Sequence, residues 1–264
     1  MILARRIALN GVQLDRVDDR ILISGIDEAA NRNQQNTVDR MYDGQRLTVN
    51  RRQSLDVNVS FRIRIPRAQM GARDAVLDAV IAWAQGGGTL RIMSKPDKVL
   101  RNVICAQLPA RGDLYKFDTE YKIVFRALTV PYWQSLEATT ASKNRTRDGS
   151  MTLIAAGTAP SVLDFTAENV GSGTCNTMTI GTGSSNRMIF SSLGLEPGEI
   201  LTGDHSNGLL RLRITGTNGK TRSAMAKRTA ASSDEIRIKP GANEISVTAG
   251  AACTFAVSSI GRYY

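Results

Sequence analysis

The alternating pattern from Leu55 to Ile65 constrains the fold of this chain more than any other feature of its sequence. Apolar side chains occupy every second position without a break, and polar side chains lie between them. A period of two predicts a β-strand that buries one face and exposes the other. At about 3.3 Å per residue this strand is roughly 36 Å long, which exceeds the typical length. Phe61 is predicted to anchor the core, and Pro66 to end the strand.

One helix and several more strands are predicted in the first half of the chain. Val76, Val80 and Trp83 recur at steps of three and four residues, which indicates a helix that ends at the glycines 86–88. Strands are predicted at 7–14, 21–26, 89–94, 99–107 and 121–127, with a polar loop at 31–36. We therefore expect a β-sandwich or sheet with one helix packed on it. The alternating helices of a parallel nucleotide-binding fold are missing from this pattern.

The second half has the pattern of an antiparallel sandwich. Residues 134–150 lack periodicity and large apolar side chains, so they are predicted to form a linker or exposed loop. Short strands then recur at 162–165, 177–180, 188–190, 209–215, 235–239, 243–248 and 254–257. A chain of 264 residues is near the size at which a single core stops growing. We expect a mainly β protein with two domains, residues 1–133 and 134–264.

The net charge of +10 requires an explanation, and nucleic acid is the first partner to consider. Residues 1–133 hold 21 Lys and Arg against 14 Asp and Glu, so most of the excess lies there. Few aromatic residues stand among these arginines, which argues against stacking on bases. A solvated or inter-subunit face is the favoured interpretation. The clustered arginines are Arg40, Arg46, Arg51, Arg52, Arg62, Arg64, Arg67 and Arg73.

No catalytic, cofactor-binding or metal-binding residue is predicted. The single histidine, His205, lies between Asp204 and Ser206, but neighbours on an extended chain point to opposite sides, so a solvated turn residue is expected. The three cysteines are far apart in sequence, which favours buried, reduced thiols over a disulfide framework or zinc site. The glycine runs at 86–88 and 181–186 lack the features of a phosphate-binding loop.

Three motifs of the first half occur in an order that resembles the distal tail protein family of long non-contractile phage tails. They are Trp83 in the helix, the turn Pro96-Asp97-Lys98, and the closing Pro131-Tyr132-Trp133. The second half is similar to that family's galectin-like, or carbohydrate-binding-module-like, sandwich. The matching residues are Leu195-Glu196-Pro197-Gly198-Glu199, Asp204, Ile236, Ile238, Pro240-Gly241-Ala242-Asn243 and Gly261-Arg262-Tyr263. Gly203 replaces an aliphatic residue of the family, so we expect a strand to break early there.

The resemblance implies a structural virion protein at the tail tip, without catalytic activity. It implies a homo-hexameric ring formed by residues 1–133, with the second domain projecting outward. Implied partners are the tail tube protein, the tape-measure protein and the tail-tip hub or fibre, and DNA would only pass through the lumen. The sequence shows no membrane-spanning run and no secretory signal, so synthesis in the host bacterial cytoplasm is expected.

The function of the clustered arginines is a separate hypothesis. A strongly positive lumen would retain DNA instead of letting it pass. We therefore expect Arg46, Arg51, Arg52, Arg62 and Arg64 to bind acidic surfaces on neighbouring subunits or on the tube.

Two other function classes stay open. A carbohydrate-binding adhesion module would need an exposed aromatic platform, and few aromatic residues follow Trp133. A basic nucleic-acid-binding protein would bind duplexes with a steep salt dependence. A related baseplate protein of a contractile tail or tail-like particle is also compatible with the motifs, and the resemblance leaves open saccharide binding by the second domain.

Overall fold

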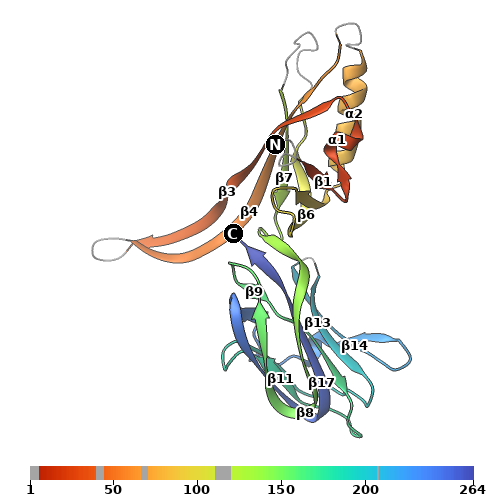
Figure 1. Ribbon diagram of the computed structural model, residues 1–264. Coiled ribbons are helices and arrows are strands. Elements are labelled where there is room, and N and C mark those ends of the chain that lie inside the picture. Colours follow the sequence, from red (N-terminus) through yellow and green to blue (C-terminus); the bar gives the residue numbers. More distant parts are fainter. Residues whose placement is uncertain (1–5, 40–44, 67–70, 111–119, 207) are drawn as a thin grey trace. The chain divides into compact units, whose positions relative to one another are not determined.

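The computed structural model describes residues 6–39, 45–66, 71–110, 120–206 and 208–264, with the backbone alone for 30–39, 45–53 and 206. The chain divides into two compact units, Met1–Trp133 and Gln134–Tyr264, called unit 1 and unit 2 below. The fold is mainly β, and antiparallel strands make up most of both units (Figure 1). In the described ranges, no helix has the length and apolar character needed to cross a membrane.

Unit 1 is an antiparallel sheet with one long helix. The strands pair in the order β2-β1-β5-β6-β7-β4-β3. The elements are β1 (Ile7–Leu9), β2 (Val12–Gln13), α1 (Leu14–Val17), β3 (Ile21–Asp39), β4 (Gln45–Ile63), α2 (Ala72–Gln85), β5 (Gly88–Ile92), β6 (Lys98–Gln107) and β7 (Glu120–Ala127).

The core of unit 1 confirms the alternation from which the fold was predicted. Every second residue from Leu55 to Ile63 is buried, and the Phe61 ring stacks on Tyr121 of β7 at 5.4 Å. α2 buries Val76, Leu77, Val80 and Ala84, the stripe expected for a helix on a sheet. Trp83 is half-buried; its ring meets the edge of Phe125, and its indole N–H donates to the Val12 carbonyl at 3.0 Å. The described side chains of unit 1 thus pack β-strands and helix around one core.

β3 and β4 form a two-stranded ribbon that is longer than predicted (Figure 1). Residues 31–36, predicted as a loop, continue β3, and β4 begins at Gln45, well before the alternating segment. These predictions were wrong because the outer part of the ribbon is mostly polar, and its apolar residues Val38, Leu47 and Val49 are too few to form a sustained period-two pattern. The predicted strand 7–14 is also wrong in its second part, where a turn, β2 and the four-residue helix α1 replace it.

Unit 2 is an antiparallel sandwich in which one strand serves two sheets. β17 pairs with β11 through Ser246–Ala249 and with β10 through Cys253–Ser258. The main sheet has the order β15-β14-β13-β10-β17-β8, β12 extends β11, and β9 pairs with β16. The elements are β8 (Trp133–Ala155), β9 (Ser161–Val162), β10 (Asp164–Asn169), β11 (Met178–Gly181), β12 (Arg187–Phe190), β13 (Ile200–Ser206), β14 (Leu209–Thr215), β15 (Thr221–Ser223), η3 (Met225–Lys227), β16 (Arg237–Ile238) and β17 (Gly241–Tyr263).

Two predictions for the second half were wrong, and both underestimated the length of a strand. Residues 134–150 belong to the long strand β8, and their side chains are mostly exposed, so no apolar alternation marks the strand. β13 runs through Gly203 to Ser206 and does not break early. A Cβ at Gly203 would overlap the ring of Phe165, which is buried on β10, so glycine allows this ring to pack against the strand.

Candidate interaction surfaces

The five arginines predicted at an interface lie along one strand but not in one cluster. By backbone position Arg46, Arg51 and Arg52 lie in the outer part of the ribbon, opposite Val38, Gln34 and Asn33 of β3. Arg62 lies near the other end of β4, opposite Glu120 of β7, and is exposed, as is Arg64 just beyond the strand. Sixteen residues of extended chain, from 46 to 62, span about 50 Å. One copy of the chain therefore cannot bring all five to the same contact.

The remaining clustered arginines do not extend this surface. Arg73 is buried in α2 with 3% of its surface exposed, so the prediction of a solvated face was wrong for this residue. Arg73 lies in the first turn of α2 and is buried together with Val76 and Leu77 of the same helix. Arg40 and Arg67 lie outside the described residues.

The outer part of the ribbon has backbone groups without a sheet neighbour. β4 pairs with β7 from Leu55 to Arg62, and in the described chain residues 45–54 pair with β3 alone. An isolated two-stranded hairpin is marginally stable in water. Its two edges carry unpaired N–H and C=O groups that can pair with another chain. The ribbon is therefore a surface that gains stability from a partner.

Glu28 contacts Lys95, which directly precedes the Pro96-Asp97-Lys98 motif, and Trp133, which ends the Pro131-Tyr132-Trp133 motif. Its Oε2 accepts hydrogen bonds from the Trp133 indole at 2.8 Å and from the Lys95 ammonium at 2.6 Å. The same ammonium lies 4.8 Å from the centre of the Trp133 ring, in a cation–π arrangement. Trp133 is 1% exposed. The turn at Lys95 and the closing tryptophan are thus held to β3 by one carboxylate, and this contact assigns both motifs to packing.

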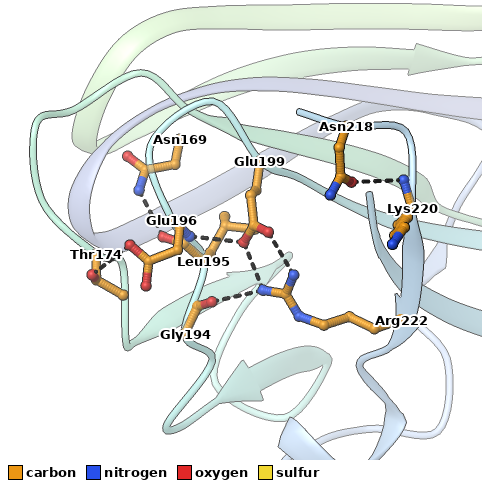
Figure 2. A network of polar contacts seen from close by, with 9 residues as sticks. All are labelled: Asn169, Thr174, Gly194, Leu195, Glu196, Glu199, Asn218, Lys220 and Arg222. Carbon is orange, nitrogen blue, oxygen red and sulfur yellow. Dashed lines mark hydrogen bonds and ion pairs between the residues drawn. The ribbon is translucent and has the colours of Figure 1, made fainter. Parts of the chain in front are cut away.

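The family motif Leu195–Glu199 of unit 2 forms a polar clamp (Figure 2). The Glu199 carboxylate is buried and accepts both Arg222 amino groups, at 2.5 and 2.6 Å, and the Glu196 amide at 2.9 Å. Arg222 also donates to the Gly194 carbonyl at 2.8 Å. The Arg222 guanidinium and the Glu196 amide together hold the pKa of Glu199 below its usual value, against the effect of burial. Both charges are therefore satisfied within the protein.

Two of the hollows on the described part of unit 2 have no aromatic side chain in their lining. The first, of about 170 Å³, lies between Glu199 and the turn from Gly216 to Arg222. The second is a groove of about 610 Å³ along residues 170–174 and 250–252, with Arg145 and Arg147 at its side. Glycine, alanine and serine dominate the walls of this groove. Neither hollow has the aromatic platform on which sugars or bases stack.

His205 is not the solvated turn residue that the sequence predicted. It lies in β13, its side chain is 5% exposed, and its Nδ1 is 2.7 Å from Oδ1 of Asp164 on β10. The same Oδ1 accepts the His205 amide at 3.0 Å. The partner is Asp164 from the neighbouring strand, and not the adjacent Asp204, which pairs with Arg213. No period or motif in the sequence marks this pair, because it depends on the register of β10 and β13.

The cysteines are free, as predicted, but two of them lie together. Cys175 and Cys253 are buried, whereas Cys105 is half-buried, so the prediction of full burial was wrong for Cys105. Within the parts of the chain that the structure describes, no group of three or more His, Cys, Asp or Glu side chains could hold a metal ion.

Comparison with known proteins identifies a fold. No protein-family model matches the sequence, and no curated protein matches it. The structure is similar to that of the Dit protein of phage SPP1, a hub of the adsorption apparatus in phages that infect Gram-positive hosts. The two share 13% sequence identity with a TM-score of 0.67, over 96% of this chain and 97% of that chain.

The baseplate of phage p2 in its activated conformation gives weaker matches. The structure with Sr has 7% identity and a TM-score of 0.45, over 96% of both chains. The structure with Ca has 7% identity and a TM-score of 0.44, over 90% of both chains. The match to SPP1 Dit extends over both units, so the chain has a Dit-like fold from end to end.

Proposed function

We propose that this chain is a structural subunit of a phage or prophage tail, and that it forms a hexameric ring at the distal end of the tail tube. The observation that carries the proposal is the ribbon of β3 and β4, whose outer part has no third strand in the described chain. A ring of identical copies would supply each ribbon with a neighbour. The full-length fold likeness to SPP1 Dit supports the same assignment.

The ring would join the tube to the host-recognition apparatus at the virion tail tip. Its partners would be the tail tube protein, the tape-measure protein and the tail-tip hub or fibre, with DNA passing through the lumen. In this proposal the chain needs interfaces and no catalytic groups. The carboxylates of Glu199 and Asp56 are consistent with that, because each pairs with an arginine of its own unit.

Arg46, Arg51 and Arg52 are proposed to contact acidic groups of a neighbouring subunit, and Arg62 and Arg64 to contact a different surface of the neighbour or tube. Along extended β4 the two groups are separated by at least about 33 Å, the distance from position 52 to position 62, so two contact sites are required instead of one. Arginine suits such contacts because its planar guanidinium binds carboxylates through two parallel hydrogen bonds.

The test is the mass of the purified chain by size-exclusion chromatography with light scattering, at low and moderate salt. We expect six times the chain mass of 28.6 kDa. The decisive variant removes residues 30–55 and joins Ala29 to Asp56, which are paired in register, through an Asn-Gly turn. This variant should be a folded monomer.

Two outcomes would contradict the proposal. One is a wild-type chain that stays monomeric at every concentration and salt tested. The other is a hexamer that persists without the ribbon. Reversing the charge of Arg62 and Arg64 should weaken assembly, whereas reversing the exposed Lys220 and Lys239 of unit 2 makes the same charge change and should leave it intact.

A carbohydrate-binding function of unit 2 has less support. The two hollows lack aromatic side chains, and the larger one is lined mainly by small residues. A glycan array probed with the full chain tests this alternative directly, and titration of a DNA duplex at several salt concentrations tests the nucleic-acid alternative.

A further inference from the structure

Cys175 and Cys253 lie side by side in the core of unit 2, although the sequence separates them widely. Both side chains have 0% of their surface exposed and belong to the same apolar cluster. Cys253 pairs in register with Asn169 of β10. The Leu195 carbonyl accepts both the Asn169 side-chain amide at 2.7 Å and the Cys175 backbone amide at 2.8 Å. One carbonyl oxygen therefore connects the Cys175 backbone to Asn169, the residue that lies opposite Cys253.

A direct contact links the two sulfur atoms. The Cys253 thiol hydrogen-bonds to the Cys175 sulfur, and the backbone amides of Gly250 and Ala251 also point to that sulfur. These donors lower the pKa of Cys175 despite its burial, while the contact and burial raise the pKa of Cys253. The Cys175 thiol itself donates to the Thr177 carbonyl at 3.3 Å, so the two side chains form one hydrogen-bonded pair of thiols.

The groove of unit 2 runs beside the two segments that carry the cysteines. Thr174 and Ala252, the residues that directly precede the two cysteines, line this groove, as do Gly250 and Ala251. The residues that precede the two cysteines in the chain thus form part of one wall of the groove, and most of the side chains of this wall are small. A small reagent that enters the groove needs only a local opening of this wall to reach the sulfurs.

We propose that Cys175 and Cys253 are a modification site: a dithiol that closes into an intramolecular disulfide when a small two-electron oxidant is present. With a diazene such as diamide, the two S–H bonds break, one S–S bond forms, and both hydrogens reduce the N=N bond to a hydrazine. With a low-molecular-weight disulfide, the same bond forms by two exchange steps that release two small thiols. The product ties β17 to the segment that precedes β11.

The disulfide would stabilise unit 2 by restricting its unfolded chain. A tail protein that functions outside the cell would be more stable in an oxidising medium with this disulfide than without it. That last consequence rests on the proposed function, whereas the chemistry does not. Oxidation of the purified chain and assembly of the ring are measured separately, so either can fail without the other.

The experiment uses the Cys105→Ser protein, whose only cysteines are Cys175 and Cys253. The folded protein is treated with diamide. After denaturation, thiol titration should find both thiols lost, and the intact mass should fall by two hydrogen atoms. A peptide map should contain one linked peptide with Cys175 and Cys253, and the thermal midpoint should rise until a reductant is added. If Cys105→Ser does not fold, wild-type protein with Cys105 alkylated in the native state serves instead.

The matched controls are Cys175→Ala and Cys253→Ala in the same background, each of which keeps a single buried thiol. Neither should lose mass or form a linked peptide. The proposal is overturned if both thiols of the folded protein stay titratable under conditions that oxidise a model dithiol peptide. It is also overturned if oxidation yields only dimers linked between chains.

Discussion

Substitution of Glu199 by Gln tests whether the clamp of unit 2 is electrostatic. The carboxylate accepts two guanidinium donors and one backbone amide, all within 2.9 Å. Gln offers one acceptor oxygen and turns an NH₂ group toward either Arg222 or the Glu196 amide. Charge-assisted hydrogen bonds contribute about 1.5 to 3 kcal/mol each, but the Arg222 side chain is 47% exposed and can rehydrate. We expect a loss of about 2 kcal/mol at neutral pH.

The pH dependence of this loss gives the sharper test. The pKa of Glu199 is lower in the folded protein than in the unfolded chain, chiefly because Arg222 stabilises the carboxylate. A depressed pKa adds stability that is fully present above the unfolded value, near 4.3, and is lost as the pH falls through the folded value. The difference between wild type and Glu199→Gln should therefore be constant above about pH 5 and shrink at lower pH.

Calorimetry combined with tryptophan fluorescence assigns the effect to the correct unit. Both tryptophans, Trp83 and Trp133, belong to unit 1, so their fluorescence follows that unit while calorimetry detects both. The exposed Glu244, changed to Gln, is the matched control and should have no effect. The electrostatic account fails if the Glu199→Gln difference is the same at pH 3 and pH 7. The electrostatic account also fails if Glu199→Gln shifts only the unfolding transition that tryptophan fluorescence follows, which is that of unit 1.

The remaining predictions concern packing at two sites and one hydrogen bond. Phe61→Ala should cost about 3 to 5 kcal/mol by leaving a cavity beside Tyr121, measured by urea unfolding with tryptophan fluorescence; an unchanged midpoint would contradict its burial. Gly203→Ala should cost about 1 to 3 kcal/mol because its Cβ meets the Phe165 ring, and Phe165→Leu should cost less in that background than in wild type. Glu28→Gln should cost about 1 kcal/mol and change the emission of the Trp133 indole, whereas an unaltered spectrum would argue against their hydrogen bond.

The sequence predicted the elements whose apolar side chains alternate visibly. The strand through Phe61 and the helix through Val80 were found because large apolar residues mark their buried faces. β17 was predicted as two strands because Ala249 and Ala251 occupy the middle of its buried face. Alanine is too small and too common on surfaces to signal burial. The alternation is nevertheless unbroken from Ile245 to Ser259 in the structure.

The polar contacts could not be predicted, because they join residues that only the sheet registers bring together. The pairs Glu28 with Trp133 and Glu199 with Arg222 include residues of the motifs quoted above, yet nothing in the sequence indicates which residues are their partners. The same holds for Cys175 and Cys253, whose separation in sequence argued against contact. Long strands made mostly of polar residues are missed by sequence analysis for a different reason. Outer β3 has few apolar residues, and most side chains of β8 are exposed, so hydrophobic periodicity, the main signal of a strand, is weak in both.

The hydrogen bond between Trp133 and Glu28 also bears on how the chain folds during synthesis. It joins positions 105 residues apart and involves the last residue of unit 1. A growing chain can pair β3 with β4 early, but it cannot place the closing indole until the ribosome has released the whole of unit 1. Unit 1 therefore lacks the hydrogen bond between Trp133 and Glu28 until its translation is complete. A chain truncated before Trp133 would lack this hydrogen bond at any folding time.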